Sequence, residues 1–253
     1  ISYHQMKDRP NVSLWSDILN ALKGELGGIT GAPTVGTFIA FEGGEGTGKS
    51  TQSKMLKEWL EARGEKVVLS REPGGTDLGQ GLRKILLGHE TGEISPRAEA
   101  LLYAADRAHH VFSVIRPALA NGDVVITDRY FDSSIAYQGA GRILSPGEVA
   151  RISRWATESL FPTLTIVIDL PAEIGIGRLK SHDRLEAEPL AFHERVRQEF
   201  LQLARLDPER YLIVDGTQSI EDIHEQIVSR VGEIPALKRN AADRISLNVK
   251  VKY

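Results

Sequence analysis

The run Gly43-Gly44-Glu45-Gly46-Thr47-Gly48-Lys49-Ser50 matches the pattern G-x-x-x-x-G-K-[ST] of a phosphate-binding loop. Glycines let successive backbone N–H groups turn inward around an anion, and a helix that starts after the loop adds the positive end of its dipole. In this pattern the amine of Lys49 reaches the β- and γ-phosphates of a nucleotide, and the hydroxyl of Ser50 ligates Mg²⁺. The run therefore predicts a site for ATP and its magnesium ion.

Charged residues follow two further apolar segments. Asp128 follows the apolar segment Val124–Ile126, at a strand end where phosphate-loop proteins hold Mg²⁺ with a carboxylate. Arg129 is next in the chain, and Arg71 stands before the rigid turn Glu72-Pro73-Gly74-Gly75-Thr76. Two guanidinium groups at adjacent strand ends suit a second phosphate that lies opposite ATP. Alternatively, Asp128 is an ordinary turn residue, and Arg71 and Arg129 form ion pairs at the surface.

Two pairs of residues are spaced four apart, so each pair shares one helix face. Tyr103 and Arg107 form one pair, and Ser134 and Gln138 form the other. An aromatic ring beside a guanidinium can stack on a base while the guanidinium donates to the edge of that base. The same spacing is also typical of a helix in which one side chain packs into the core and its neighbour lies in solvent at the edge of that core.

The short segment Gly139-Ala140-Gly141-Arg142 consists of small residues followed by one arginine. Phosphoryl transfer needs positive charge at the moving γ-phosphoryl group, and Thr47 in the phosphate loop is not basic. A second cation beside Lys49 must therefore come from elsewhere. We expect a mobile lid that carries Arg142 to supply it.

These residues need a scaffold, and the chain alternates between strand and helix patterns from Thr37 onward. The expected strands are Thr37–Phe41, Lys66–Arg71, Asp123–Thr127, Leu164–Leu170 and Tyr211–Val214. The expected helices are Gln52–Arg63, Pro96 to about Leu119, Gly147–Ser159, Leu190–Leu206 and Ile220–Val231. This alternation predicts an α/β fold with a parallel five-stranded sheet, helices on both faces, and ligands at the carboxyl ends of the strands.

Composition narrows the class of protein. The 253 residues carry a formal net charge of -3 without a long basic run, which argues against a nucleic-acid-binding groove. The chain has no cysteine, so disulfides and thiolate metal sites are excluded. No apolar run is as long as a membrane span. We expect a cytoplasmic protein without a membrane span.

Residues 1–36 differ from the rest of the chain. Ser13 is a suitable cap for an amphipathic helix over Leu14–Leu26, and a glycine-rich connector follows it at residues 27–33. This extension either packs on its own folded domain or a second copy, or docks on another partner. Its polar face is not basic, which disfavours a membrane surface. We therefore divide the chain into an extension at 1–36, a folded domain at 37–234 and a tail at 235–253.

Taken together, these residues resemble the thymidylate kinase (dTMP kinase) family. The matching runs are Phe38–Thr51, Arg71–Thr76, Asp128-Arg129-Tyr130 and Ser133–Gly139. Many NTPases share the phosphate loop, whereas the other three runs are far more specific. The resemblance covers about residues 37–234 and implies a P-loop nucleoside monophosphate kinase fold and a homodimer.

The resemblance also implies a reaction, MgATP + dTMP → ADP + dTDP, on the route to dTTP. It implies that residues Gly43–Thr51 hold ATP and that Lys49 stabilises the transferring phosphoryl group. Ser50 and Asp128 would organise Mg²⁺.

For the acceptor, the resemblance implies that Arg71 and Arg129 hold the dTMP phosphate and that Glu45 accepts from the 3′-hydroxyl. The remaining roles concern the base and the sugar. Tyr103 would stack on thymine with Arg83 nearby, Arg107 and Gln138 would read its edge beside Ser134, and Tyr137 would crowd the 2′ position. Arg142 resembles the lid arginine of a bacterial subtype whose phosphate loop lacks a basic residue.

Chemistry supports a choice of thymine, because thymine has an N3–H donor and an O4 acceptor where cytosine has the reverse. A buried unpaired polar group costs roughly 1–3 kcal/mol, enough for one to two orders of magnitude of discrimination. The alternatives are a related kinase with another base choice and a catalytically silent nucleotide-binding module attached through residues 1–36. Lys49, Ser50, Asp128 and Arg142 are all present, which argues against a silent module.

Overall fold

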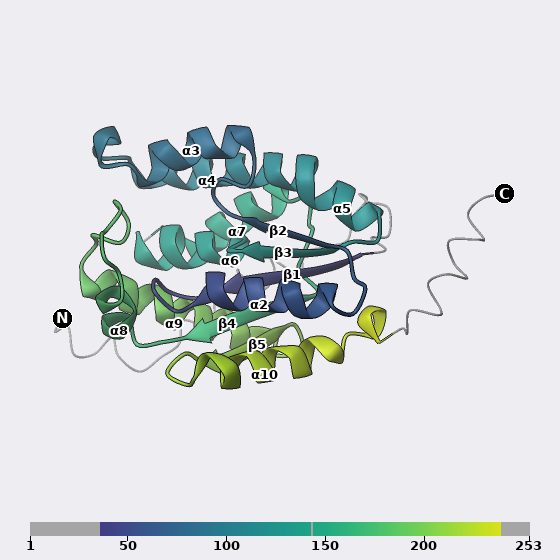
Figure 1. Ribbon diagram of the computed structural model, residues 1–253. Coiled ribbons are helices and arrows are strands. Elements are labelled where there is room, and N and C mark those ends of the chain that lie inside the picture. Colours follow the sequence, from purple (N-terminus) through teal and green to yellow (C-terminus); the bar gives the residue numbers. More distant parts are fainter. Residues whose placement is uncertain (1–35, 143, 239–253) are drawn as a thin grey trace.

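One parallel sheet of five strands organises the part of the chain that the computed structural model describes, residues 36–142 and 144–238 (Figure 1). The strands are β1 (Thr37–Glu42), β2 (Val67–Arg71), β3 (Val124–Asp128), β4 (Leu164–Asp169) and β5 (Tyr211–Asp215). They lie in the order β2-β3-β1-β4-β5, which confirms the predicted parallel sheet. Because β1 pairs with both β3 and β4, the phosphate loop leaves the sheet at its centre.

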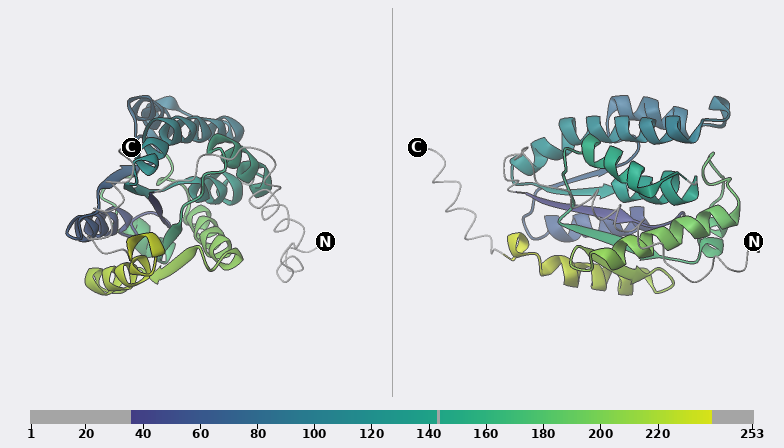
Figure 2. Two further views of the ribbon diagram at one scale, coloured as in Figure 1. Left: turned by 90° about the vertical axis from the view of Figure 1, so that its right-hand side faces the viewer. Right: turned by 180° about the vertical axis from the view of Figure 1, so that it is seen from behind.

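Helices cover both faces of the sheet (Figure 2). One face packs against α2 (Lys49–Glu61) and α10 (Ile220–Gly232). The helices of the other face are α4 (Pro96–His110), α5 (Arg116–Ala120), α6 (Phe131–Ser134), α7 (Pro146–Ala156) and α9 (Leu190–Leu206). Side chains of β1 alternate between the two cores, with Phe38 in one and Ile39 in the other. Strands buried on both faces need apolar residues at every position, which explains the continuous apolar runs.

The long helix expected from Pro96 to about Leu119 forms with an interruption. α4 passes into a π-helical segment, Val111–Ile115, which continues into α5. Pro117 lies in the first turn of α5, lacks a backbone N–H and crowds the carbonyl four residues earlier, so a wider turn precedes it. Gly122, with a φ of 82°, follows the end of this helix.

The prediction of a mobile loop at Gly139–Arg142 is wrong. Helix α6 continues as a π-helical segment, Ile135–Gly141, that packs against α7 and α9. Both glycines of the segment are buried. A Cβ added to Gly141 would lie 2.6 Å from the ring of Phe192. The glycines therefore serve close packing between helices here, not flexibility.

Four further elements were not predicted. They are α3 (Asp77–Leu87), the short helix α8 (Ala172–Gly177) and two turns of 3-10 helix, at His89–Thr91 and Pro235–Leu237. Thr76 caps α3 by accepting from the backbone N–H of Gly79 at 2.9 Å. Both α3 and α8 contain two glycines, which weaken the helical signal in the sequence.

The predicted extension helix, Leu14–Leu26, and the tail beyond residue 238 lie outside the described residues. Among the helices at residues 36–142 and 144–238, none is long and apolar enough to cross a membrane.

We predict that Gly141→Ala lowers the free energy of unfolding by about 1–3 kcal/mol, because the new methyl group overpacks the contact with Phe192. Thermal or urea denaturation measures the change. Gly81→Ala is the matched control: it also lies in a helix, with nothing within 4 Å of the added Cβ. It should raise the stability by about 0.5–1 kcal/mol. Equal effects of the two substitutions would contradict the packing role of Gly141.

Candidate active site

The phosphate loop between β1 and α2 has the backbone that its glycines permit. Gly43, Gly46 and Gly48 have φ angles of 133°, 64° and 96°, in the region that favours glycine. A Cβ on Gly46 would lie only 2.0 Å from the carbonyl oxygen of Gly175 in α8. The loop therefore needs glycine both for its turn and for its contact with α8.

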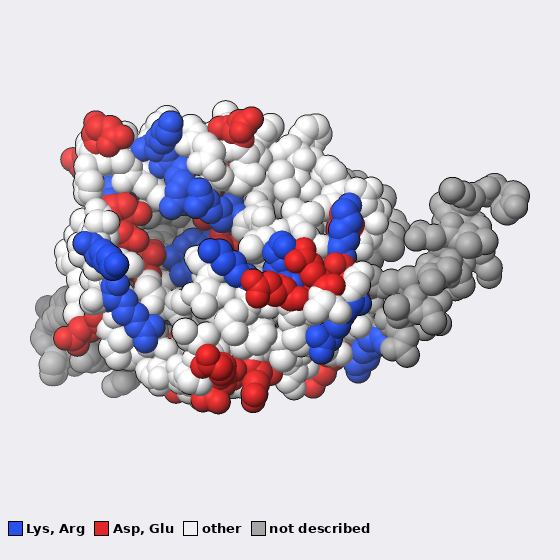
Figure 3. Space-filling view, in the orientation of Figure 1, with Lys and Arg blue, Asp and Glu red and all other residues white. Residues whose placement is uncertain are grey.

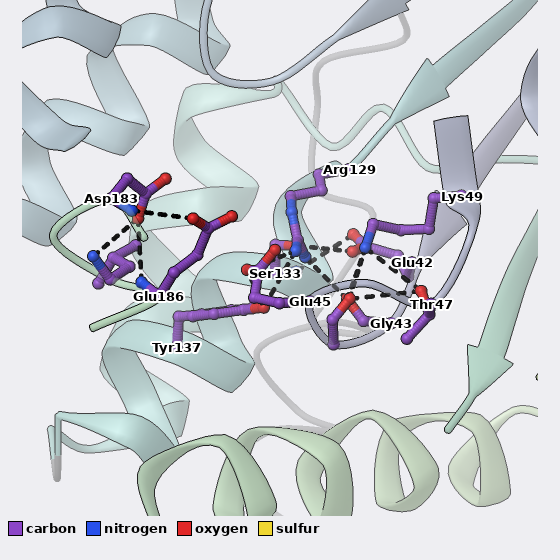
Figure 4. A network of polar contacts seen from close by, with 12 residues as sticks. Glu42, Gly43, Glu45, Thr47, Lys49, Arg129, Ser133, Tyr137, Asp183 and Glu186 are labelled. Carbon is purple, nitrogen blue, oxygen red and sulfur yellow. Dashed lines mark hydrogen bonds and ion pairs between the residues drawn. The ribbon is translucent and has the colours of Figure 1, made fainter. Parts of the chain in front are cut away.

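Lys49 begins α2 and lies folded across the loop (Figure 4). Its Nζ donates to the carbonyl oxygens of Gly44 at 2.6 Å and Gly43 at 3.2 Å. Burial, with the nearby positive charge of Arg129, lowers the pKa of Lys49 from 10.5 to about 8, although Glu45 opposes the shift. A bound anion would favour the charged form of this amine.

Ser50 and Asp128 meet beside the loop, where the predicted metal site lies. The Ser50 hydroxyl donates to Oδ2 of Asp128 at 2.6 Å. Asp128 is brought there because β3 pairs with β1 in the register Phe41↔Asp128. These oxygen donors suit Mg²⁺, which keeps several waters and takes further ligands from substrate phosphates. Within the described ranges, no group of three or more His, Cys, Asp or Glu side chains could hold a metal ion.

Arg129 lies between the phosphate loop and the helical segment that carries Ser133 and Tyr137. Its backbone has a φ of 71°, which is uncommon for a residue other than glycine and holds the side chain toward β1. The guanidinium donates to Oε1 of Glu45 at 2.7 Å, the hydroxyl of Tyr137 at 3.0 Å, the carbonyl of Gly43 at 2.9 Å and Oγ of Ser133 at 3.1 Å. Figure 4 shows these groups turned toward one another.

Glu45 is the main partner of that guanidinium. Burial disfavours its charged form, but Arg129 and Lys49 outweigh this and lower the pKa of Glu45 to about 2. The hydroxyl of Tyr137 also donates to Oε1 of Glu45 at 2.6 Å. The site therefore holds an ionised carboxylate between its two cations.

Two adjoining pockets contain nearly all of the predicted site residues. The first is lined by Glu45, Arg83, Tyr103, Arg107, Arg129, Ser134, Tyr137 and Gln138, among others. The second is lined by residues 45–51 together with Arg71, Arg83, Asp128 and Arg129. Five lining residues are common to both: Glu45, Glu72, Arg83, Arg129 and Glu186. On the face of the molecule seen in Figure 3, Lys and Arg side chains are interleaved with acidic ones.

Arg107 is held rigidly at the wall of the first pocket. It is 1% exposed, and its Nε donates to Glu72 at 2.7 Å. Its other nitrogens donate to Oγ of Ser134 and to the carbonyl of Tyr130, both at 3.1 Å. A guanidinium has five N–H groups, so donors remain for a ligand. These contacts fix the plane of the guanidinium before a ligand arrives.

Arg142 does not lie where the sequence predicted. Its Nη1 donates to Glu188 at 2.5 Å and its Nε to Glu99 at 3.2 Å, with the guanidinium 5.2 Å from the centre of the Phe192 ring. It lines neither pocket of the site. Two carboxylates attract it away from the phosphate loop, so this geometry does not support the expected role at the γ-phosphoryl group.

A different cation reaches the loop, and the sequence analysis missed it. Arg178, just after α8, donates from Nη1 to the carbonyl of Gly46 at 3.2 Å. The segment that follows, Arg178–Glu188, contributes Leu179, Asp183 and Glu186 to the pocket walls. Its alternation of basic and acidic residues was the available signal, but it matches no phosphate-binding pattern.

Comparisons with known proteins identify the family of the chain. The profile of the thymidylate kinase family matches residues 41–227. The thymidylate kinase of Clavibacter sepedonicus is 57% identical over 199 residues, covering 77% of this chain and 94% of that protein. The thymidylate kinase of Leifsonia xyli is 56% identical over 200 residues, covering 78% of this chain and 94% of that protein. The crystal structure of thymidylate kinase from Ehrlichia chaffeensis has a TM-score of 0.65 and 31% identity, covering 78% of this chain and 98% of that one.

We predict that the affinity for ATP falls as the pH rises through the pKa of Lys49, about 8, because the amine is charged below that pH and neutral above it. One pH unit above the pKa, the dissociation constant for ATP should be about tenfold larger than at low pH. Titration calorimetry between pH 7 and pH 9.5 measures it.

The control for this titration is Lys54→Met, which removes an exposed lysine of the same helix and should retain the pH dependence. Lys49→Met should bind weakly at every pH. A wild-type affinity that is constant through this range would contradict the depressed pKa.

Proposed function

The chain belongs to the thymidylate kinase family, and we propose that its two adjoining pockets carry out the family's reaction with the residue roles given below. The fold is that of the P-loop nucleoside monophosphate kinases. The protein transfers the γ-phosphoryl group of ATP to dTMP and forms dTDP. The observation that carries the residue assignment is the shared wall of the pockets, where Glu45 and Arg129 face both.

In this proposal, ATP lies on the phosphate loop and dTMP fills the first pocket. Arg71 and Arg129 hold the dTMP phosphate, because Arg71 ends β2 directly beside Asp128 in the sheet register. The base lies against Tyr103, with Arg107 and Gln138 at its edge and Arg83 beside it. Lys49 then leaves the carbonyls of its own loop for the phosphates, which are stronger acceptors.

Ser50 and Asp128 are the residues that would hold Mg²⁺. When bound, the ion neutralises charge on the phosphate oxygens. Glu45 would accept from the 3′-hydroxyl of the sugar, and Tyr137, held by Glu45, would limit the space at the 2′ position. The acceptor phosphate is already ionised, so the reaction needs no catalytic base, and alignment of the two phosphates supplies most of the rate enhancement.

We assign the second cation at the moving phosphoryl group to Arg178 in place of Arg142. Arg178 already contacts the phosphate loop, and it is itself an exposed residue. Arg142 is held by Glu99 and Glu188, at a distance from the loop.

Steady-state phosphoryl transfer from MgATP to dTMP, dUMP, dCMP and dGMP tests the proposed function. We expect a clear preference for dTMP. Transfer to another monophosphate would retain the kinase mechanism and contradict the assignment of the base pocket. ATP binding without transfer to any of them would favour a silent module.

We predict that Arg178→Ala lowers kcat at least about tenfold with a smaller effect on the KM for dTMP, because a cation at the phosphoryl group acts mainly in the transition state. Coupled measurement of ADP release gives both constants. Arg205→Ala, which removes an exposed arginine of α9, is the control and should leave both unchanged. Wild-type turnover of the Arg178 variant would remove this residue from the mechanism.

We also propose that the protein is a homodimer through α4 and α7. An apolar groove between these helices is lined by Ala100, Leu101, Leu144, Val149 and Ile152, with three charged residues at its edge. Large apolar side chains on α4, on α7 and on the π-helical segment Val111–Ile115 are exposed. The exposed fractions are 57% for Leu101, 74% for Phe112 and 81% for Trp155. An apolar groove of this kind, with exposed apolar side chains on the helices that form it, is typical of protein interfaces.

We predict that Leu101→Glu shifts the protein from dimer to monomer, because it places a charge in the apolar interface. Sedimentation velocity over a range of protein concentrations measures the shift. Leu78→Glu is the control, since Leu78 is 53% exposed but lies on α3, away from the groove. A dimer that resists the Leu101 substitution, or a monomeric wild type, would contradict this interface.

Residues 37–234 are proposed as the kinase domain, in keeping with the family match at 41–227. The docking of residues 1–36, the absence of a nucleic-acid partner and the cytoplasmic location stay predictions from the sequence.

A further inference from the structure

Glu99 lies at the centre of a buried polar cluster, and none of the roles above includes this carboxylate. It lies on α4 and is 0% exposed. Its Oε1 accepts from Nε2 of Gln138 at 3.0 Å and from Nε of Arg142 at 3.2 Å. Its Oε2 accepts from Nη2 of Arg142 at 3.3 Å and also from Nη2 of Arg184. One carboxylate therefore contacts two arginines and also Gln138, a residue of the first pocket, in which the base of dTMP is proposed to lie.

The two arginines keep this carboxylate ionised. Burial opposes the charged form, but the hydrogen bonds from Gln138, Arg142 and Arg184 outweigh it and lower the pKa of Glu99. An ionised carboxylate has no proton to donate and can only accept. The Gln138 amide must therefore turn its NH₂ group toward Glu99, whichever ligand is bound.

That orientation decides what Gln138 presents to the pocket. Gln138 lines the pocket together with Tyr103 and Arg107. Its Oε1 receives no hydrogen bond from the residues that the structure describes. With the NH₂ group held on the side of Glu99, this oxygen is the acceptor that Gln138 offers to a ligand. The pocket then offers an acceptor from Gln138 and donors from Arg107.

We propose that Glu99, which lines neither pocket, is a specificity-determining positioning residue that fixes the Gln138 amide with its oxygen toward the pyrimidine. This inference rests on the proposed function, in which Gln138 and Arg107 meet the edge of the base. An N3–H donor, as in thymine, pairs with that oxygen. The unprotonated N3 of cytosine meets it as a second acceptor, and the pair is repelled.

The reverse orientation of the amide is disfavoured by the charge on Glu99. Turning it would place Oε1 of Gln138 against a carboxylate oxygen and would lose a charge-assisted hydrogen bond. An uncharged amide at position 99 has both a donor and an acceptor, so either orientation of Gln138 would find a partner. Removal of the charge should therefore relax the choice of base without removing any residue of the pocket.

The test is Glu99→Gln, measured as the ratio of kcat/KM for dTMP to that for dCMP. We expect this ratio to fall at least about tenfold, with dTMP still phosphorylated. Glu188→Gln is the matched control, because it makes the same change of charge on the other carboxylate partner of Arg142 without contacting Gln138. It should keep the wild-type ratio. A folded Glu99 variant with the wild-type ratio, or an equal fall in the Glu188 variant, would overturn the proposal.

A second measurement uses the wild-type protein, so it does not depend on the stability of a variant. Neutron diffraction from the deuterated protein with dTMP locates the deuterium atoms of the Gln138 amide. We expect both on the atom that faces Glu99, and finding them toward the base would overturn the inference. A wild type that does not phosphorylate dTMP would instead overturn the proposed function, so the two failures are distinct.

Discussion

The partly buried contact between Arg129 and Glu45 is the interaction on which the site depends. It joins the end of β3 to the phosphate loop, two segments 84 residues apart in the chain. Removing two charges from water costs several kcal/mol per ion, so such a pair persists only where further hydrogen bonds complete it. Here Tyr137, Ser133 and a loop carbonyl complete it. The central position of β1 in the sheet and the positive φ of Arg129 bring these groups together.

Helix α4 makes a second set of buried polar contacts, and they explain why this helix carries charged residues on its core face. Glu99 and Arg107 are both fully buried, and each is paired with a partner from another segment. Because Arg107 is fixed by Glu72 and Gln138 by Glu99, the donors and acceptors of the base pocket are set before a ligand binds. Such preorganisation reduces the ordering cost of binding and makes a mismatched base leave a polar group unpaired.

Much of the scaffold could be predicted because its signals are local. Buried strands appear in the sequence as apolar runs. The phosphate loop has a recognisable motif, in which Gly43, Gly46 and Gly48 adopt positive φ angles. Glycines misled the prediction at Gly139 and Gly141, where close packing against α7 and α9 requires them within a helical segment. Arg142 was misplaced because its partners, Glu99 and Glu188, are distant in sequence and only the fold reveals them. Arg178 was missed because its contact with the loop depends on the packing of α8.

The most direct test of the junction at Glu45 compares dTMP with its 3′-deoxy analogue as acceptors, in the wild type and in the Glu45→Gln variant. If the carboxylate of Glu45 accepts from the 3′-hydroxyl, the wild type should prefer dTMP in kcat/KM by about tenfold, and the variant should lose most of that preference. The same preference in both proteins would show that the sugar does not meet Glu45, and would contradict an acceptor site built on the contact between Arg129 and Glu45.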